Sequence, residues 1–141
     1  VNLDAVWYGA QEAAKRMIAA KTPGSIINVA SILGMRVQNG LAAYCTAKAG
    51  VLQLTRSLAI ELARFEIRVN AIAPGYILTE INDTFFSSPE GDAMRKNIPQ
   101  RRIGDPSDLD GTLLLLASAK ASGYMTGSAV VVDGGHSLPL F

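Results

Sequence analysis

The sequence has little cysteine, little histidine and no excess of charge of one sign. Among its 141 residues there is one cysteine and one histidine, and 13 basic side chains balance 12 acidic ones to a formal net charge of +1. A single cysteine excludes an internal disulfide and a cysteine-pair metal site, so we expect no bound metal. The dispersed charge also lacks the clustered lysine and arginine typical of nucleic-acid binding.

The sequence also lacks a long apolar run. No stretch approaches the ~18 apolar residues that a membrane-spanning helix requires, and the first residues do not follow the charged-then-apolar plan of a signal peptide. Hydrophobic residues make up 49% of the chain and charged residues 18%, which is typical of a soluble protein. We therefore expect one cytoplasmic domain without membrane contact.

Helical and strand patterns alternate along the chain. Apolar residues recur at three- and four-residue steps in the helical stretches, and short β-branched runs that are apolar on both faces are typical of buried parallel strands. The predicted helices cover 3–20, 41–64 and 105–117, and the predicted strands cover 25–30, 67–73 and 129–132. This order predicts an α/β protein with about three parallel strands and flanking helices.

The segment 76–102 interrupts this alternation. It is polar, carries prolines at 89 and 99, and holds Phe85 and Phe86 in its middle. A connection this long at the carboxyl end of a strand is typical of a lid or binding loop. Together with the apolar residues that follow Ser31, the two phenylalanines suggest a cleft that accepts apolar ketones.

Tyr44 and Lys48 are four residues apart in the predicted helix 41–64, so their side chains lie on one face. An ammonium group beside a tyrosine stabilises the phenolate and allows the hydroxyl to shuttle protons. Ser31 directly follows the strand 25–30, at the strand end where ligands bind in open α/β sheets. The Tyr44–Lys48 spacing alone is better explained by an amphipathic helix with a solvated lysine.

The whole set of motifs resembles the compact, non-extended branch of the short-chain dehydrogenase/reductase family. The resemblance covers essentially the whole chain and implies the carboxyl-terminal half of a Rossmann-like, doubly wound parallel sheet. The matching residues are Ser31 with the strand before it, Tyr44, Lys48, Arg68–Gly75, Ile77, Thr79, Thr126-Gly127 and Asp133-Gly134-Gly135.

The resemblance implies a role for each of four residues in catalysis. Tyr44 would be the acid that protonates the substrate oxygen, and the base in the reverse direction. Ser31 would hydrogen-bond that oxygen, and Lys48 would assist Tyr44 and bind the ribose of NAD or NADP. Asn2 would support a proton path to the lysine, although an asparagine at a helix start also has a purely structural explanation.

The resemblance also implies a cofactor site after the second strand. Tyr44 and Lys48 would contact the cofactor, Pro74 and Gly75 would turn the chain beneath the nicotinamide, and Ile77 and Thr79 would hydrogen-bond it. Without the upstream match, an ordinary strand-ending turn would explain this group.

The function implied is reversible hydride transfer between NAD or NADP and a small carbonyl or alcohol substrate. The alternative is a catalytically silent dinucleotide-binding scaffold or sensor on the same fold. Members of the family are commonly tetramers or dimers that pair two long helices, so we expect a homo-oligomer.

No glycine-rich phosphate-binding turn occurs in the sequence, although dinucleotide-binding sheets usually begin with one. We therefore expect residues 1–141 to be the carboxyl-terminal part of a single NAD(P)-binding domain, with the segment 76–102 as a substrate-loop insertion. Alone, this part should bind cofactor weakly and be inactive, and its first strand should present an unpaired edge.

Four further residues have chemically capable side chains, and we expect none of them to act in catalysis. We interpret Cys45 as a small buried filler, with a reactive thiol as the alternative. Asn28 and Asn70, inside predicted strands, should be satisfied structural groups. His136 has no accompanying metal ligands and should be a surface residue or an oligomer contact.

Overall fold

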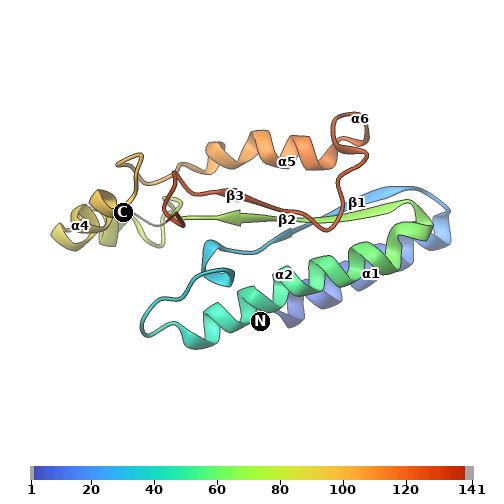
Figure 1. Cartoon of the computed structure of the whole chain (residues 1–141), viewed down its shortest axis with the longest axis horizontal. Coiled ribbons are helices and arrows are strands. Elements are labelled where there is room, and N and C mark those ends of the chain that lie inside the picture. The colour runs from blue at the N-terminus through green and yellow to red at the C-terminus, as the bar shows by residue number, and fades with distance from the viewer. Residues whose placement is uncertain (1, 139–141) are drawn as a thin grey trace.

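Three parallel strands form a sheet with helices on both of its faces (Figure 1). The computed structural model describes residues 2–138. The strands β1 (Gly24–Val29), β2 (Ile67–Pro74) and β3 (Ala129–Val132) lie in the order β1-β2-β3. Helices α1 (Asp4–Ala20) and α2 (Ala42–Leu62) cover one face, and α5 (Asp110–Ala117) covers the other. The predicted class, three parallel strands with flanking helices, is confirmed.

The register brings the carboxyl ends of all three strands to the same end of the sheet. Val29 pairs with Ile72 across β1 and β2, and Pro74 pairs with Val132 across β2 and β3. Segments that follow different strands therefore meet at this end, which is where ligands bind in open α/β sheets.

The two crossover connections have opposite hands. Helix α2 joins β1 to β2 and α5 lies between β2 and β3, and the two helices lie on opposite faces while the strands step in one direction (Figure 1). Right-handed crossovers are the strong rule, so one of these two departs from it. The departure lies next to the long segment 76–102, which gives the chain length to change faces.

The remaining elements are short. The segment 76–102 contains α3 (Asp83–Phe86) and α4 (Pro89–Asn97), in keeping with a loop that has at most short helices. The predicted helix 105–117 begins differently: Asp105 caps a 3-10 turn, η3 (Pro106–Leu109), before α5 starts at Asp110. The others are η1 (Ile32–Gly34), η2 (Ala63–Phe65) and α6 (Ala119–Ser122).

Small side chains let α1 and α2 approach the sheet. Ala10 and Ala14 of α1 are buried in one apolar cluster with Leu58 of α2 and Ile26 and Val69 of the strands. Burial of such side chains stabilises the fold by about 25 cal/mol per Å² of apolar surface. This cluster fixes α2, the helix that carries Tyr44 and Lys48, against β1 and β2.

Asn28 and Asn70 are structural, as expected. The Asn28 amide donates to Thr55 Oγ1 at 2.9 Å. The Asn70 amide donates to the Met125 carbonyl at 2.8 Å, and its side-chain oxygen accepts from the Ser128 amide at 3.1 Å. Asn70 thereby joins β2 to the turn that precedes β3.

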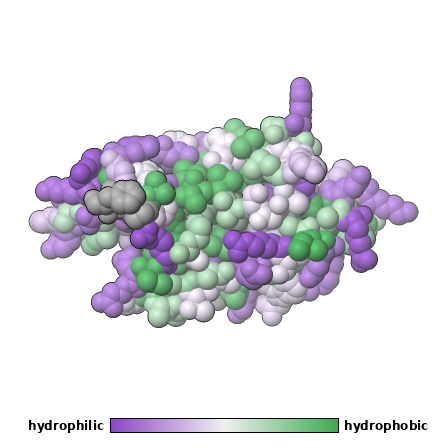
Figure 2. Space-filling view, in the orientation of Figure 1, coloured by the Kyte–Doolittle hydropathy of each residue, from purple (hydrophilic) through white to green (hydrophobic). Residues whose placement is uncertain are grey.

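Both outer strands have open edges within the described residues. Val29, at the end of β1, is 57% exposed, and Val131 of β3 is also exposed. Figure 2 shows apolar side chains over the middle of one face, with polar side chains toward both ends. Within residues 2–138, no helix is both long and apolar enough to cross a membrane.

Candidate active site

Lys48 is the most constrained charged side chain of the site. It is only 9% exposed, and its Nζ donates to the Val29 carbonyl at 3.0 Å and lies 5.7 Å from the centre of the Tyr44 ring. Burial lowers the pKa of Lys48 below its usual range because it disfavours the charged form. The structure therefore holds an ammonium group next to Tyr44, at the end of β1.

Ser31 and Tyr44 line one cavity of about 280 Å³, together with Gly75 and Tyr76. Ser31 comes from the end of β1, Tyr44 from the first turn of α2, and Gly75 and Tyr76 from the end of β2. The rest of the wall is apolar and consists of Ile32, Leu33 and Leu41. The structure thus brings together the predicted serine, tyrosine and glycine.

The Ser31 side chain is positioned by the turn that follows it. Its Oγ accepts from the Leu33 amide at 3.1 Å and so caps η1. A hydroxyl has one proton to donate as well as lone pairs to accept with. Ser31 is therefore held in place and can still donate to a ligand oxygen.

Gly34 allows η1 to pack directly on α2. A Cβ at this position would lie 2.7 Å from the Lys48 carbonyl oxygen and 2.9 Å from Leu52 Cδ1. The segment after Ser31 therefore touches the backbone of Lys48 itself, and this contact fixes the serine relative to the lysine.

Asn2 lies on a different side of Lys48. The two residues line a cavity of about 430 Å³ between α1 and β1, with Val6, Gly9 and Val29 among its other walls. The structure places Asn2 near Lys48, but the cavity that holds Ser31 and Tyr44 is separate. A link from Asn2 to the reaction centre would pass through the lysine.

Gly75 has a structural reason for being glycine. A Cβ at this position would lie 2.7 Å from Asp133 Cβ, because β3 ends beside it. Pro74 is the last residue of β2 and pairs with Val132. The close approach of β3 explains why residue 75 is a glycine, independently of any ligand.

Ile77 and Thr79 do not join the cavity of Ser31 and Tyr44. Ile77 lines another cavity of about 390 Å³ with Gly104 and Asp133. The Asn82 side chain donates to the Ile77 carbonyl at 2.9 Å and accepts from the Thr79 amide at 2.8 Å. The Ile77 carbonyl and the Thr79 amide, two groups that could serve a cofactor, are already engaged by Asn82.

Phe85 and Phe86 do not form the expected apolar cleft. Phe86 is buried, and its ring packs edge-on against Tyr76 and Phe85 at 5.6 Å and 5.1 Å between ring centres. Phe86 therefore packs within the segment 76–102, against Tyr76 at its start, and Phe85 is exposed. The apolar wall near Ser31 comes from Ile32, Leu33 and Leu41 instead.

His136 is half-buried and not an exposed surface residue, while the alternative, an oligomer contact, stays a prediction. Its ring lies 5.3 Å from the Tyr76 ring, and its Nδ1 is buried without a hydrogen-bond partner within residues 2–138. The turn at Asp133 folds the chain back, because that carboxylate accepts from the Gly135 and Ser137 amides. Burial raises the pKa of the Asp133 carboxyl, but hydrogen bonds from the Ser137 side chain and from the Ser137 and Gly135 amides, together with the nearby His136, lower it overall.

Sequence reasoning missed Tyr76 and Arg36. Tyr76 donates to Gln38 Oε1 at 2.8 Å and stands between the cavity of Ser31 and a neighbouring cavity that holds Arg36. The sequence does distinguish Arg36, because it is the one charged residue in the apolar stretch directly after Ser31.

Cys45 is buried in α2, which confirms its role as a filler. No group of three metal-ligating side chains occurs in the part of the chain that the structure describes.

Known proteins match this chain over almost all of its length. The family model described as Enoyl-(Acyl carrier protein) reductase matches residues 1–137. The 3beta-hydroxysteroid dehydrogenase 1 of Eggerthella lenta is 42% identical over 139 residues, which are 98% of this chain and 53% of that protein. The chain spans about half the length of the curated relatives it matches.

Solved structures share the fold. A short-chain type dehydrogenase/reductase from Mycobacterium marinum has a TM-score of 0.90 at 42% identity and covers 98% of this chain and 54% of its own. A gluconate 5-dehydrogenase from Burkholderia cenocepacia J2315, solved with NADP and tartrate, has a TM-score of 0.92 at 36% identity and covers 99% and 55%. With the family match over residues 1–137, these likenesses show that the chain belongs to the short-chain dehydrogenase/reductase family.

Proposed function

We propose that the full-length protein is an oxidoreductase that reversibly transfers hydride between a nicotinamide cofactor and a small carbonyl or alcohol substrate. One observation carries the proposal: Ser31 and Tyr44 line one cavity, and a buried Lys48 lies one helical turn from Tyr44 with its ammonium 5.7 Å from the tyrosine ring. These groups suit a reaction in which a substrate oxygen gains or loses a proton.

Tyr44 and Ser31 act on the substrate oxygen. In reduction, the Tyr44 hydroxyl donates its proton to the oxygen of the carbonyl as that oxygen becomes an alkoxide. The Ser31 hydroxyl donates a hydrogen bond to the same oxygen and fixes its position. In oxidation, the tyrosine takes the proton back from the alcohol.

Lys48 connects the proton chemistry to the cofactor. One of its three N–H groups is used by the Val29 carbonyl, and two remain for the ribose hydroxyls of the cofactor. Its positive charge favours the phenolate that Tyr44 forms after proton transfer. Asn2, in the cavity on the other side of Lys48, would hold by hydrogen bonding a water molecule that passes a proton to or from the lysine.

A nicotinamide cofactor fits the residues present in part. Lys48 has free donors, and Gly75 borders the cavity of Ser31 and Tyr44, so Pro74 and Gly75 would lie beneath the nicotinamide. Asn82 engages the Ile77 carbonyl and the Thr79 amide. Ile77 and Thr79 would therefore contact the cofactor through their other polar groups, or after the Asn82 side chain moves. When bound, NAD or NADP supplies or accepts the hydride. The NADP in the gluconate 5-dehydrogenase structure supports this class of cofactor.

We also infer that the full-length protein is a homo-oligomer, either a tetramer or a dimer. Large apolar and aromatic side chains are exposed on the two long helices, with Trp7 and Tyr8 on α1 and Ile60 on α2. Exposed apolar patches of this kind are typical of interfaces between subunits.

The test is Tyr44→Phe in the full-length protein, followed by cofactor absorbance with a panel of small ketones. Loss of the acid should lower kcat by roughly 10²- to 10⁴-fold, while cofactor binding, measured by fluorescence titration, should persist. Tyr124→Phe is the control, because it removes the hydroxyl of a fully exposed tyrosine and should leave kcat unchanged. Unchanged turnover in Tyr44→Phe would disprove the role of the tyrosine. Cofactor binding without turnover of any ketone or alcohol by the wild type would favour the silent scaffold.

A further inference from the structure

A second cavity adjoins the one that holds Ser31 and Tyr44. It measures about 300 Å³, and both cavities are lined by Ile32, Leu33 and Tyr76. The two cavities are therefore neighbours, and a ligand that places its reacting oxygen beside Ser31 would have these three residues between its reacting end and the second cavity. The second cavity is the natural place for the rest of such a ligand.

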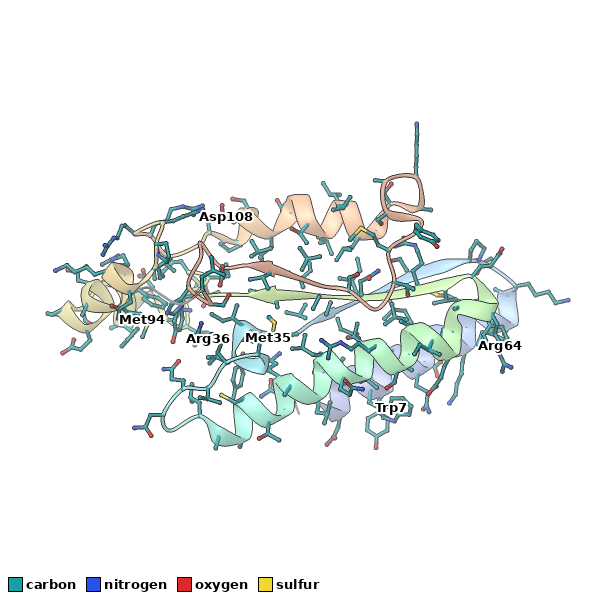
Figure 3. The ribbon with its side chains drawn as sticks, viewed as in Figure 1. Trp7, Met35, Arg36, Arg64, Met94 and Asp108 are labelled. Carbon is teal, nitrogen blue, oxygen red and sulfur yellow. The ribbon has the colours of Figure 1, made fainter. Side chains whose placement is uncertain are left out.

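The walls of this second cavity come from every segment that follows a strand end. Arg36, Val37 and Gln38 come from the segment after β1, Met94 and Asn97 from α4, and His136 from the turn after β3. Figure 3 shows Arg36 at the end of the sheet, on the side where Met94 of α4 lies. The cavity is therefore an assembled site that only the folded chain creates.

The polar groups of this cavity favour an anion. Its lining includes the Arg36 guanidinium, two amides and an imidazole, and no aspartate or glutamate. Arg36 takes part in none of the ion pairs found within residues 2–138, and its Nη1 donates to a neutral acceptor, the Ser137 carbonyl. The nearby Asp133 carboxylate lines a different cavity and is bonded to backbone amides.

Two features fit a planar carboxylate better than a neutral group. A guanidinium presents several N–H donors in a fork that matches a carboxylate, and only one is needed by Ser137. Within residues 2–138, no protein group bonds Nδ1 of His136, so a carboxylate oxygen would supply the partner that this nitrogen lacks. Tyr76 is held by Gln38 at 2.8 Å, which fixes a side chain that lines both cavities.

We propose that the second cavity binds a carboxylate of the substrate, with Arg36 as the principal partner and His136 beside it. The proposal rests on the proposed function, because the reacting end of the substrate lies at Ser31 and Tyr44. It replaces the apolar ketone suggested by the sequence with a class of oxo acids and hydroxy acids. In these substrates a short apolar stretch, facing Ile32 and Leu33, separates the reacting carbon from the carboxylate.

The test compares keto acids of increasing chain length, beginning with levulinate, with their methyl esters as substrates of the full-length protein. The wild type should prefer at least one acid over its ester by roughly tenfold or more in kcat/KM, as expected for a charged hydrogen bond. Arg36→Gln should abolish that preference by raising KM for the acid, with little change for the ester. Arg36→Lys should retain part of it, because the charge remains without the fork.

Two further variants keep the result interpretable. Lys96→Gln removes one positive charge from the exposed surface of α4, outside the cavity, and should leave the preference intact. Asn97→Asp places a carboxylate in the cavity wall and should lower use of the acid relative to the ester, even if Arg36→Gln proves unstable. Equal use of acids and esters by the wild type, or equal losses in Arg36→Gln and Lys96→Gln, would overturn the proposal.

A binding measurement separates this proposal from the proposed function. If no keto acid, ester, small ketone or alcohol is turned over, the oxidoreductase proposal fails, and the carboxylate site is then tested by thermal stabilisation with levulinate alone. Stabilisation of the wild type and of Lys96→Gln, but not of Arg36→Gln, would support the site. Equal stabilisation of all three proteins, or none, would overturn it.

Discussion

The segment Ser31–Lys48 and the segment Tyr76–Gly104 both follow a strand end, but they are held in different ways. In the first, the two ends are fixed, because Ser31, Ile32 and Lys48 are buried and Gly34 touches the backbone of α2, while residues 35–43 between them are exposed. The second is largely exposed and rests on two buried side chains, Phe86 and Ile98, with ion pairs on its surface.

This difference separates two tasks. A group that transfers protons needs a fixed position, and the first segment provides it through close backbone contacts. A group that recognises the variable part of a substrate can lie on a loop that changes without cost to the core. Arg36, from the exposed middle of the first segment, and Met94 and Asn97 of the second segment line the second cavity in this way. Substitutions should therefore affect the two segments very differently.

The largest effect should come from Lys48→Met in the full-length protein. We expect kcat/KM to fall by roughly 10²-fold or more, because the substitution removes the ammonium from Tyr44 and from the cofactor ribose. The unfolding free energy should change by less than about 1.5 kcal/mol, because relief from burying a charge opposes the loss of the bond to the Val29 carbonyl. Initial rates and urea unfolding measure the two quantities. A large loss of stability would mean that Lys48 is structural.

The same variant should remove a dependence of stability on pH. Burial lowers the pKa of Lys48 in the folded protein, so the unfolded chain binds the proton more tightly. The wild type should therefore gain stability as the pH rises from about 7 toward about 10, which is close to the ordinary pKa of lysine. Lys48→Met should lack this gain in urea unfolding at the two pH values, and an identical profile would contradict the burial of a charged lysine.

Gly34→Ala should have the next largest effect. The new Cβ would lie 2.7 Å from the Lys48 carbonyl, and we expect a loss of about 1–3 kcal/mol of stability from overpacking together with a lower kcat. Gly9→Ala is the matched control, since it lies in α1 with nothing within 4 Å of the added Cβ, and it should be neutral or stabilising by up to about 1 kcal/mol. Equal melting temperatures for the two variants would contradict the close packing of the first segment.

The smallest effect should come from Arg102→Gln, in the second segment. Arg102 and Asp108 form a two-bond ion pair, with the second bond at 2.9 Å, and this pair lowers the pKa of the Asp108 carboxyl to about 2. In the variant this pKa should rise toward its ordinary value, as an NMR titration of the carboxyl would show. Any stability from the pair should be present above about pH 4 and disappear as the pH falls through about 2. Activity at neutral pH should not change, because exposed ion pairs contribute little.

Much of the fold could be predicted because each element carries its own pattern. The apolar stripes of α1 and α2 and the β-branched runs of the strands locate these elements to within a few residues. Ser31 could be placed because a strand end is a local feature, and the structure brings it to the cavity of Tyr44. The α-helix starts at Asp110 and not at the predicted 105, because an acidic cap followed by proline begins a 3-10 turn as readily as an α-helix.

The rest of the site depends on contacts between distant segments. Phe86 is buried because Tyr76 and Phe85 surround it, and His136 is half-buried because the Asp133 turn folds it onto Tyr76. Ile77 and Thr79 are engaged by Asn82, which no spacing in the sequence announces. Arg36 lines a cavity only because the fold places α4 and the chain after β3 next to it.

The bond from Lys48 to the Val29 carbonyl also limits the sheet. The amide of Ala30 donates to Ile72 of β2, and neighbouring residues of a strand direct their backbone groups to opposite sides, so the Val29 carbonyl faces the open edge of β1. Lys48 occupies this carbonyl at 3.0 Å. A strand that adds to the open edge would therefore share the Val29 carbonyl with Lys48, so pairing along β1 and the position of the lysine proposed for proton chemistry depend on the same oxygen.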